Sequence, residues 1–245
     1  MVPVEPAGAV LEDHAVAVRD GRVEAVLPAS GAAAAYPGYE TLDLPGHVLI
    51  PGLVNAHTHA AMCLMRGLSD DLPLMRWLQE HIWPAEAKHV SAEFVRDGTL
   101  LACAEMLRGG ITCFNDMYFF PEASLEAALA ARMRSAQGLI TIEFPSAYAS
   151  DAADYLARGL AVRDRWREEP LASFCLAPHA PYTVSDDSFR RIAALAAELD
   201  LPVHVHLHET ADEVERSVAE HGVRPLERLR RLGLLGPGLI AVHAV

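Results

Sequence analysis

"PGLVNAHTHA", Pro51 to Ala60, ends an apolar run in two histidines that are separated by one residue. Side chains alternate in direction along a β-strand with a period of two. His57 and His59 are therefore predicted to point the same way if the strand continues through them. A neutral imidazole nitrogen binds zinc at about 2.0–2.1 Å. The pair alone is too short to decide between part of a metal site and two polar residues in a turn after a strand, so the rest of the chain has to distinguish them.

The composition favours a soluble globular protein. The chain has 245 residues, of which 51% are hydrophobic and 22% are charged, and its formal net charge is −13. A polyanion such as nucleic acid is a poor partner for so acidic a surface. No apolar run has the roughly 18 residues of a membrane helix, and no basic-then-apolar signal segment occurs. We therefore expect a cytoplasmic protein without membrane or nucleic-acid partners, and the sequence leaves a homo-oligomer open.

The cysteines also favour a cytoplasmic location. There are four of them, and none forms a CxxC pair. Cys103, Cys113 and Cys175 lie in apolar segments, which predicts reduced residues that pack in a core. Cys63 follows His59 by four residues, and packing is the preferred interpretation for it too.

Strand-like and helix-like segments alternate along most of the chain. Residues 14–27 predict two strands around the turn dipeptide Asp20-Gly21, and residues 28–44 predict a connection. Beyond the strand that ends at His57 and His59, strands are predicted over 111–117, 138–144, 171–180, 201–209 and 239–245. Helices are predicted over 91–110, 121–134, 151–168, 185–200, 210–222 and 224–233.

Apolar strands that are separated by helices indicate a parallel sheet covered on both faces. Such a sheet is either doubly wound or closed as an eight-stranded barrel. The nucleotide-binding motifs GxGxxG and GxxxxGK[ST] are both missing, which weakens the doubly wound interpretation. Polar residues gather where the strands end, as they do in (β/α)8 barrels. We predict a TIM-type barrel of the α/β class.

The number of strands is smaller than a full barrel requires. Six strands are predicted from about residue 48 onward, whereas a barrel has eight strands in about 250 residues. The sequence therefore predicts a barrel that is truncated after its sixth strand.

A second histidine-rich stretch, "HVHLHET", spans residues 204–210 and ends in Glu209 followed by a threonine. One of its histidines would aim into the barrel with a metal, and Glu209 would begin the next loop. A carboxylate beside a metal-bound water can take its proton and return it to a substrate. The alternative is a strand end with ordinary, hydrogen-bonded histidines. His57, His59 and His243 at other strand ends favour the metal site.

Several motifs together resemble the amidohydrolase superfamily, and more closely its 5-methylthioadenosine/S-adenosylhomocysteine deaminase branch. They are "PGLVNAHTH", "APHAPYT", "HVHLHET", "AVHAV", "FNDMYFFPEA" and "PLERLRRLGLLGPGLIAVH". The resemblance covers essentially all 245 residues. It implies a (β/α)8 barrel with a small β-sandwich built from both chain ends. Residues 1–47 would then be partial sandwich strands and a linker, and residues 48–245 strands one to six of the barrel.

The resemblance also implies roles for five residues that carry the chemistry. His57, His59 and His206 correspond to zinc ligands, and Glu209 to the group that shuttles protons. His243 corresponds to a histidine that orients the attacking water. The family has a further metal-binding aspartate on its eighth strand, and no residue of this sequence matches it.

Substrate contacts are implied for three more residues. Glu86 in "IWPAEAK" resembles a carboxylate that holds ribose hydroxyls, and Trp77 resembles an aromatic wall of the same pocket. His179 resembles a further contact. The simpler interpretations are a solvated charge for Glu86 and helix packing for Trp77. Only Arg158 is available to match the arginines that bind an amino-acid carboxylate, which favours methylthioadenosine over S-adenosylhomocysteine.

The predicted cofactor is one zinc ion. Binuclear relatives bridge two metals with a lysine on the fourth strand, and "LASFCLAPHA" contains none. The implied reaction is hydrolytic deamination of an adenine nucleoside, methylthioadenosine, adenosine or S-adenosylhomocysteine. Metal-bound hydroxide would attack C6, and ammonia would leave. The alternatives are hydrolysis of another heterocycle, such as a triazine or guanine, and an inactive metal-binding fragment.

Overall fold

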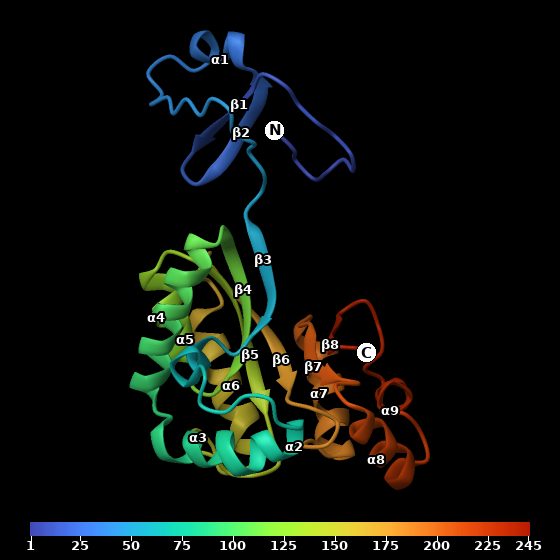
Figure 1. The fold of residues 1–245 in the computed structure, drawn as a ribbon. Helices are drawn as coiled ribbons and strands as arrows, with labels where there is room; N and C mark the ends of the chain where they lie inside the picture. Colours follow the sequence, from blue (N-terminus) through green and yellow to red (C-terminus); the bar gives the residue numbers. More distant parts are fainter. The chain divides into compact units, whose positions relative to one another are not determined.

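The computed structural model describes residues 1–245. Contacts within the chain divide it into two units, Met1–Gly52 and Leu53–Val245 (Figure 1). The division falls between Gly52 and Leu53, whereas the sequence predicts a boundary between residues 47 and 48. The two units are described separately below.

The N-terminal unit contains a β-hairpin and a short helix. Strands β1 (His14–Arg19) and β2 (Arg22–Pro28) pair in antiparallel fashion. Asp20 (φ 50°) and Gly21 (φ 73°) are both in the left-handed region, as a two-residue hairpin turn requires, so the predicted hairpin is confirmed. Helix α1 (Ala29–Ala35) follows it and buries no residue. The prediction of a plain connection here is wrong, because alanine has the highest helix propensity.

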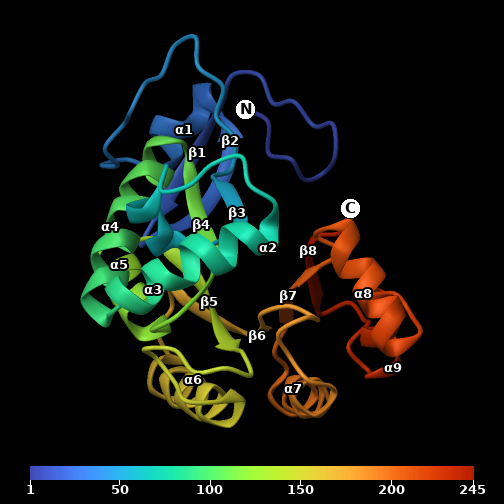
Figure 2. The same ribbon diagram turned by 60° about the horizontal axis from the view of Figure 1, so that its bottom comes forward.

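The second unit is built on one parallel sheet whose six strands neighbour one another in sequence order. They are β3 (Leu53–Thr58), β4 (Ile111–Tyr118), β5 (Arg134–Thr141), β6 (Ala172–Pro178), β7 (Val203–Leu207) and β8 (Leu239–His243). A doubly wound sheet would reverse its strand order partway. The unbroken order gives a nearly closed barrel with helices on its outside, as Figure 2 shows, and confirms the TIM-type prediction.

Helices follow the strands, as the sequence predicts. They are α4 (Ala92–Arg108), α5 (Pro121–Ala130), α6 (Ala152–Trp166), α7 (Asp186–Leu199), α8 (Ala211–His221) and α9 (Pro225–Arg231). Ser91, Asp151, Ser185 and Thr210 cap four of them by accepting a backbone N–H with the side chain. None of the helices has both the length and the apolar character that crossing a membrane requires.

One strand is displaced from its predicted position. The sequence predicts a helix to residue 134 and a strand over 138–144, but α5 ends at Ala130 and β5 spans Arg134–Thr141. The start of this strand was not predicted because Ser135 and Gln137 are polar. Both are buried and hydrogen-bonded to each other (Gln137 Nε2 to Ser135 Oγ, 3.0 Å), so the sheet accommodates them.

A helical segment between β3 and α4 has no counterpart among the predicted elements. It comprises η1 (Ala60–Met65), α2 (Leu74–Trp77), a π-helical stretch η2 (Leu78–Ile82) and α3 (Trp83–His89). Short helices of four to seven residues give little periodicity to recognise. The segment matters because it carries Trp77 and Glu86.

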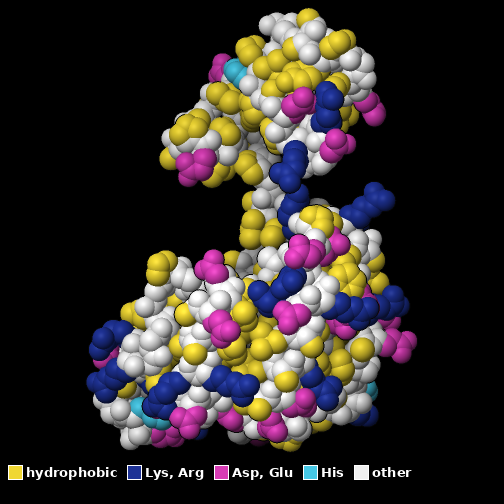
Figure 3. Space-filling model, turned by 180° about the vertical axis from the view of Figure 1, so that it is seen from behind, with side chains coloured by type: hydrophobic (Ala, Val, Ile, Leu, Met, Phe, Trp, Pro, Cys, Tyr) yellow, Lys and Arg dark blue, Asp and Glu magenta, His cyan; other side chains and the backbone are white.

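Apolar residues of the strands pack against the helices outside the barrel. Leu139, Leu176 and Val205 from the sheet join Phe189 and Ile192 of α7 in one buried cluster. Figure 3 shows basic side chains next to acidic ones on one face of this unit. The four cysteines are free, with Cys103 and Cys175 fully buried. The predicted packing in a core is thus seen for Cys103 and Cys175, whereas Cys63 and Cys113 are half-buried.

Candidate metal and catalytic site

Three histidines converge at the carboxyl-terminal ends of β3 and β7. His57 lies in β3, and His59 follows the strand as the N-cap of η1. The ring of His206, from β7, lies 4.8 Å from that of His57 and 5.2 Å from that of His59, measured between centroids. One ligand atom from each of the three lies within 4.8 Å of the others. The structure therefore brings together all three predicted metal ligands.

Hydrogen bonds fix how two of these rings present their nitrogens. Nδ1 of His59 donates to the carbonyl of Met117, and Nδ1 of His206 donates to the carbonyl of His179 (2.7 Å). A carbonyl oxygen can only accept, so each Nδ1 carries the proton. Each neutral ring then keeps an unprotonated Nε2, which is the form that a metal ion needs.

The distances fit a single zinc-sized ion. Nε2 of His57 lies 3.2 Å from Nε2 of His206. Two nitrogens bound to one tetrahedral zinc at about 2.0–2.1 Å would lie roughly 3.3 Å apart. Burial, assisted by the neighbouring imidazole of His59, lowers the pKa of His57 to about 3. The ring is therefore neutral at pH 7, and the residues present fit a divalent cation.

Glu209 begins the loop after β7 and lies beside this cluster. Its Oε1 is 3.4 Å from Nε2 of His243, and its Oε2 accepts a hydrogen bond from the Tyr182 hydroxyl (3.2 Å). The ring of His243 stacks on that of His206, with centroids 5.5 Å apart. Burial raises the pKa of the Glu209 carboxyl. A carboxyl group with a raised pKa is suited to proton transfer near neutral pH.

Glu86 is linked to the histidine cluster through Tyr118. Its Oε1 accepts a hydrogen bond from the hydroxyl of Tyr118 (2.8 Å), and the ring of Tyr118 lies 6.3 Å from that of His59. Burial raises the pKa of Glu86 to about 7. Trp77 makes no hydrogen bond to these residues, and its indole Nε1 donates to the carbonyl of Ser69 (3.0 Å).

His179 lies between the histidine cluster and the loop after β6. Its ring centroid is 5.0 Å from that of His206, and its Nδ1 is 2.9 Å from Oγ1 of Thr183. The Thr183 hydroxyl donates to the carbonyl of Ala180 (3.2 Å), so it accepts from Nδ1 of His179. Burial lowers the pKa of His179 to about 3. Its Nε2 is thus left as a hydrogen-bond acceptor.

Four residues beside the site were not among the site residues predicted from the sequence. Asp116 is buried at the end of β4, where it accepts hydrogen bonds from the N–H of Ala60 and the hydroxyl of Ser124, both at 2.8 Å. It thereby holds the turn that follows His59. Its place at the end of a strand was the signal that could have revealed it. The other three residues are Tyr182, His204 and Glu213.

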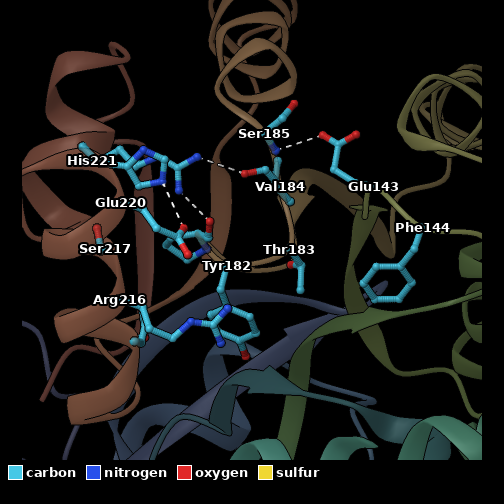
Figure 4. A pocket seen from close by; sticks show the side chains of 13 residues that line it. Glu143, Phe144, Tyr182, Thr183, Val184, Ser185, Arg216, Ser217, Glu220 and His221 are labelled. Atoms are coloured by element: carbon cyan, nitrogen blue, oxygen red, sulfur yellow. Dashed lines mark hydrogen bonds and ion pairs between the residues drawn. The ribbon is translucent and has the colours of Figure 1, made fainter.

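A cavity of about 310 Å³ adjoins the site. Figure 4 shows Tyr182, Arg216 and Glu143 among the side chains that line it. None of the eight predicted site residues belongs to this lining. Tyr182 connects the two places, because its ring is part of the wall and its hydroxyl donates to Glu209.

A parallel barrel with a histidine cluster and a neighbouring carboxylate at the strand ends has the features of a metal-dependent hydrolase. Residues 48–245 match the amidohydrolase family, and the chain belongs to that family. The resemblance found in the sequence motifs is confirmed.

Two relatives match nearly the whole of this chain. A 5-methylthioadenosine/S-adenosylhomocysteine deaminase from Saccharophagus degradans is 51% identical over 243 residues, which are 99% of this chain and 54% of that protein. The crystal structure of an adenosine deaminase from Xanthomonas campestris with bound zinc is 52% identical, with a TM-score of 0.90, and the match covers 99% of this chain and 55% of that one. The chain spans about half the length of the curated relatives that it matches.

A more distant structure shares the fold alone. The guanine deaminase of E. coli is 24% identical, with a TM-score of 0.82, and the match covers 94% of this chain and 55% of that one.

Proposed function

We propose that this protein is a zinc-dependent hydrolytic deaminase of adenine nucleosides. The observation that carries the proposal is the convergence of His57, His59 and His206, with Glu209 beside them. The names of two relatives that are 51% and 52% identical over the matched residues point to the same reaction. We assign the three histidines as ligands of one zinc ion, which supplies Lewis acidity for the activation of water when it is bound.

Glu209 is the group that moves protons in this proposal. It accepts a proton from the attacking water and delivers it to the purine ring as C6 becomes tetrahedral. Burial raises the pKa of its carboxyl group, which makes Glu209 a better proton acceptor than an exposed carboxylate and supports this role. Tyr182 holds Oε2, and His243 lies against Oε1 and orients the water.

Glu86 distinguishes a nucleoside from a free base. We assign its carboxylate as the acceptor for the two ribose hydroxyls, with Tyr118 fixing its orientation. Trp77 forms a wall of this ribose site, and His179 contacts the purine. Arg158 is bound to Asp154 within α6 (Nε to Oδ1, 2.9 Å), which favours methylthioadenosine or adenosine over the amino-acid-bearing S-adenosylhomocysteine.

A substrate panel tests the proposal. Release of ammonia would be followed with methylthioadenosine, adenosine, S-adenosylhomocysteine, adenine, guanine and an amino-substituted triazine, before and after removal of zinc. We expect the two small nucleosides to react fastest and zinc removal to abolish the reaction. Faster release from guanine or the triazine would instead place the protein among hydrolases of other heterocycles. Zinc binding without any turnover would support a non-catalytic metal-binding protein.

A further inference from the structure

His204 is a fully buried imidazole that has a single hydrogen-bonding partner. Its Nε2 lies 2.9 Å from Nδ1 of His57, and its own Nδ1 is buried without any partner. Nearly all buried polar side-chain atoms in proteins are hydrogen-bonded. An apolar side chain would fill this position of β7 at lower cost, so packing alone does not account for a histidine here.

The three histidines of "HVHLHET" have different environments. His206 faces the metal cluster. His208 accepts a hydrogen bond from the N–H of Leu226 in the first turn of α9 (3.2 Å). His204 contacts neither the cluster's centre nor a helix end, and its polar contact is with the ligand His57.

Two proton arrangements satisfy the contact between His204 and His57. In the first, Nε2–H of His204 donates to Nδ1 of His57, and His57 then carries its proton on Nε2, facing Nε2 of His206 at 3.2 Å. That proton occupies the position of the metal ion. In the second, Nδ1–H of His57 donates to Nε2 of His204, and the Nε2 atoms of His57 and His206 are both free to bind a cation.

His57 differs from the other two ligands in what holds its Nδ1 proton. For His59 and His206 the acceptor is a backbone carbonyl, which enforces the tautomer that binds metal. For His57 the acceptor is the side chain of His204, which a substitution can remove. We propose that His204 is a positioning residue for the metal site, because it accepts the Nδ1 proton of His57 and so keeps the Nε2 of that ligand available. The proposal rests on the proposed function in one respect, which is that His57 binds the metal.

Three substitutions at this position test the proposal through zinc affinity rather than turnover. The side-chain oxygen of glutamine in His204→Gln reaches about as far as Nε2 of histidine, whereas that of asparagine in His204→Asn reaches only about as far as Nδ1. His204→Leu has no acceptor. Hydrogen-bond partners of metal-ligating histidines typically contribute 10–100-fold to metal affinity. We therefore expect His204→Leu and His204→Asn to bind zinc roughly 10–100-fold more weakly than wild type, and His204→Gln to lose less than about tenfold.

The measurement is competition for zinc between the protein of 245 residues and a chromophoric chelator. Visible absorption of the cobalt-substituted protein provides a second readout, because it reports the geometry around the metal. Val205→Ala, a buried position in the same strand, is the matched control. It should lower the unfolding temperature without changing zinc affinity or the cobalt spectrum.

The outcomes separate this proposal from the proposed function. If wild type binds no zinc, or if His57→Asn binds it equally well, the metal site itself is wrong and the role of His204 falls with it. If His57→Asn loses zinc but His204→Asn binds as tightly as wild type, only the positioning role is overturned. If His204→Leu does not fold, the comparison of glutamine with asparagine decides, and equal affinities of these two variants would contradict the proposal.

Discussion

The carboxylate of Glu213 accepts a hydrogen bond from the backbone N–H of Glu209 at 2.7 Å. Its other oxygen accepts from the N–H of His208 (3.1 Å), and its own N–H donates to the side chain of Thr210 (3.2 Å). Glu213 is only 5% exposed, so these bonds are made away from bulk water. The first turn of α8 therefore fixes the backbone from which the proposed proton-transfer group extends.

Glu213→Gln should reduce turnover while leaving zinc affinity unchanged. A glutamine offers one oxygen for two backbone N–H groups, and its amide group would face the second of them, so one donor loses its partner. We expect kcat to fall by up to roughly 100-fold, because a misplacement of about 1 Å of a reacting group can cost that much. Steady-state kinetics and chelator competition measure the two effects. Glu215→Gln, an exposed position with the same change of charge, should leave both unchanged.

Glu209→Gln should abolish most of the activity and keep the metal. The three histidines proposed as ligands are untouched, but an amide can neither accept nor return the proton. General acid–base groups contribute about 10²–10⁴-fold, and we expect a loss in that range. Zinc content and single-turnover rates would be compared with wild type. A variant with zinc and near-normal kcat would show that Glu209 does not transfer protons.

Glu86→Ala should impair nucleosides more than free adenine. If the carboxylate binds the ribose hydroxyls, its removal leaves them without an acceptor in the pocket, at a cost of about 1–3 kcal/mol. Adenine has no ribose and should lose little. The ratio of kcat/KM for adenosine to that for adenine measures the difference. Equal losses for both substrates would mean that Glu86 supports the structure through Tyr118 rather than binding ribose.

The raised pKa of Glu86 predicts a dependence of stability on pH. Burial raises this pKa from 4.5 to about 7, against the opposing effect of the Tyr118 hydroxyl. The folded protein then holds a proton that the unfolded chain releases above about 4.5. The favourable contribution is complete below that pH and is lost as the pH rises to about 7.

Glu86→Gln should remove this loss, because glutamine does not titrate. Its stability relative to wild type should increase by about 3 kcal/mol between pH 4.5 and pH 8, since one pKa unit corresponds to about 1.4 kcal/mol. Urea unfolding at several pH values measures the increase. In Tyr118→Phe the pKa of Glu86 should rise further, because the hydroxyl that favours its charged form is gone. The loss of stability should then continue to a higher pH than in wild type.

Strand periodicity and strand ends made much of the site predictable. His57 and His206 lie on or beside strands whose apolar residues are recognisable, and parallel strands bring their carboxyl ends to one edge. The order of strands and helices made the barrel predictable for the same reason. These inferences need only the local pattern of the sequence.

Such patterns do not predict the contacts that loops and short helices make. Tyr182 reaches Glu209 from a loop 27 positions away, and no periodicity links the two. Asp116 bonds to Ala60 across 56 positions. His204 lies in a strand that was predicted correctly, but its pairing with His57 depends on the relative shift of two strands that are not neighbours. Sequence spacing places such residues near the site without specifying their partners.

Gly98→Ala should disturb the metal site through packing. Gly98 lies in α4 against η1, and a Cβ added there would come within 2.5 Å of the carbonyl oxygen and 2.8 Å of the Cα of Ala61. Both are backbone atoms, so the methyl group can be accommodated only if η1 moves. Overpacking of this kind costs about 1–3 kcal/mol. Because η1 begins directly after His59, the movement should also displace this proposed ligand.

We therefore expect Gly98→Ala to lower both the unfolding temperature and the zinc affinity. Gly159→Ala is the matched control, because it lies in α6 and its Cβ would approach only the side chain of Leu139, at 3.0 Å. This control should cost stability without weakening zinc binding. If Gly98→Ala lost stability but bound zinc as tightly as wild type, the position of His59 would depend on its bond to Met117 rather than on the packing of η1. The comparison thus separates the two supports of this ligand.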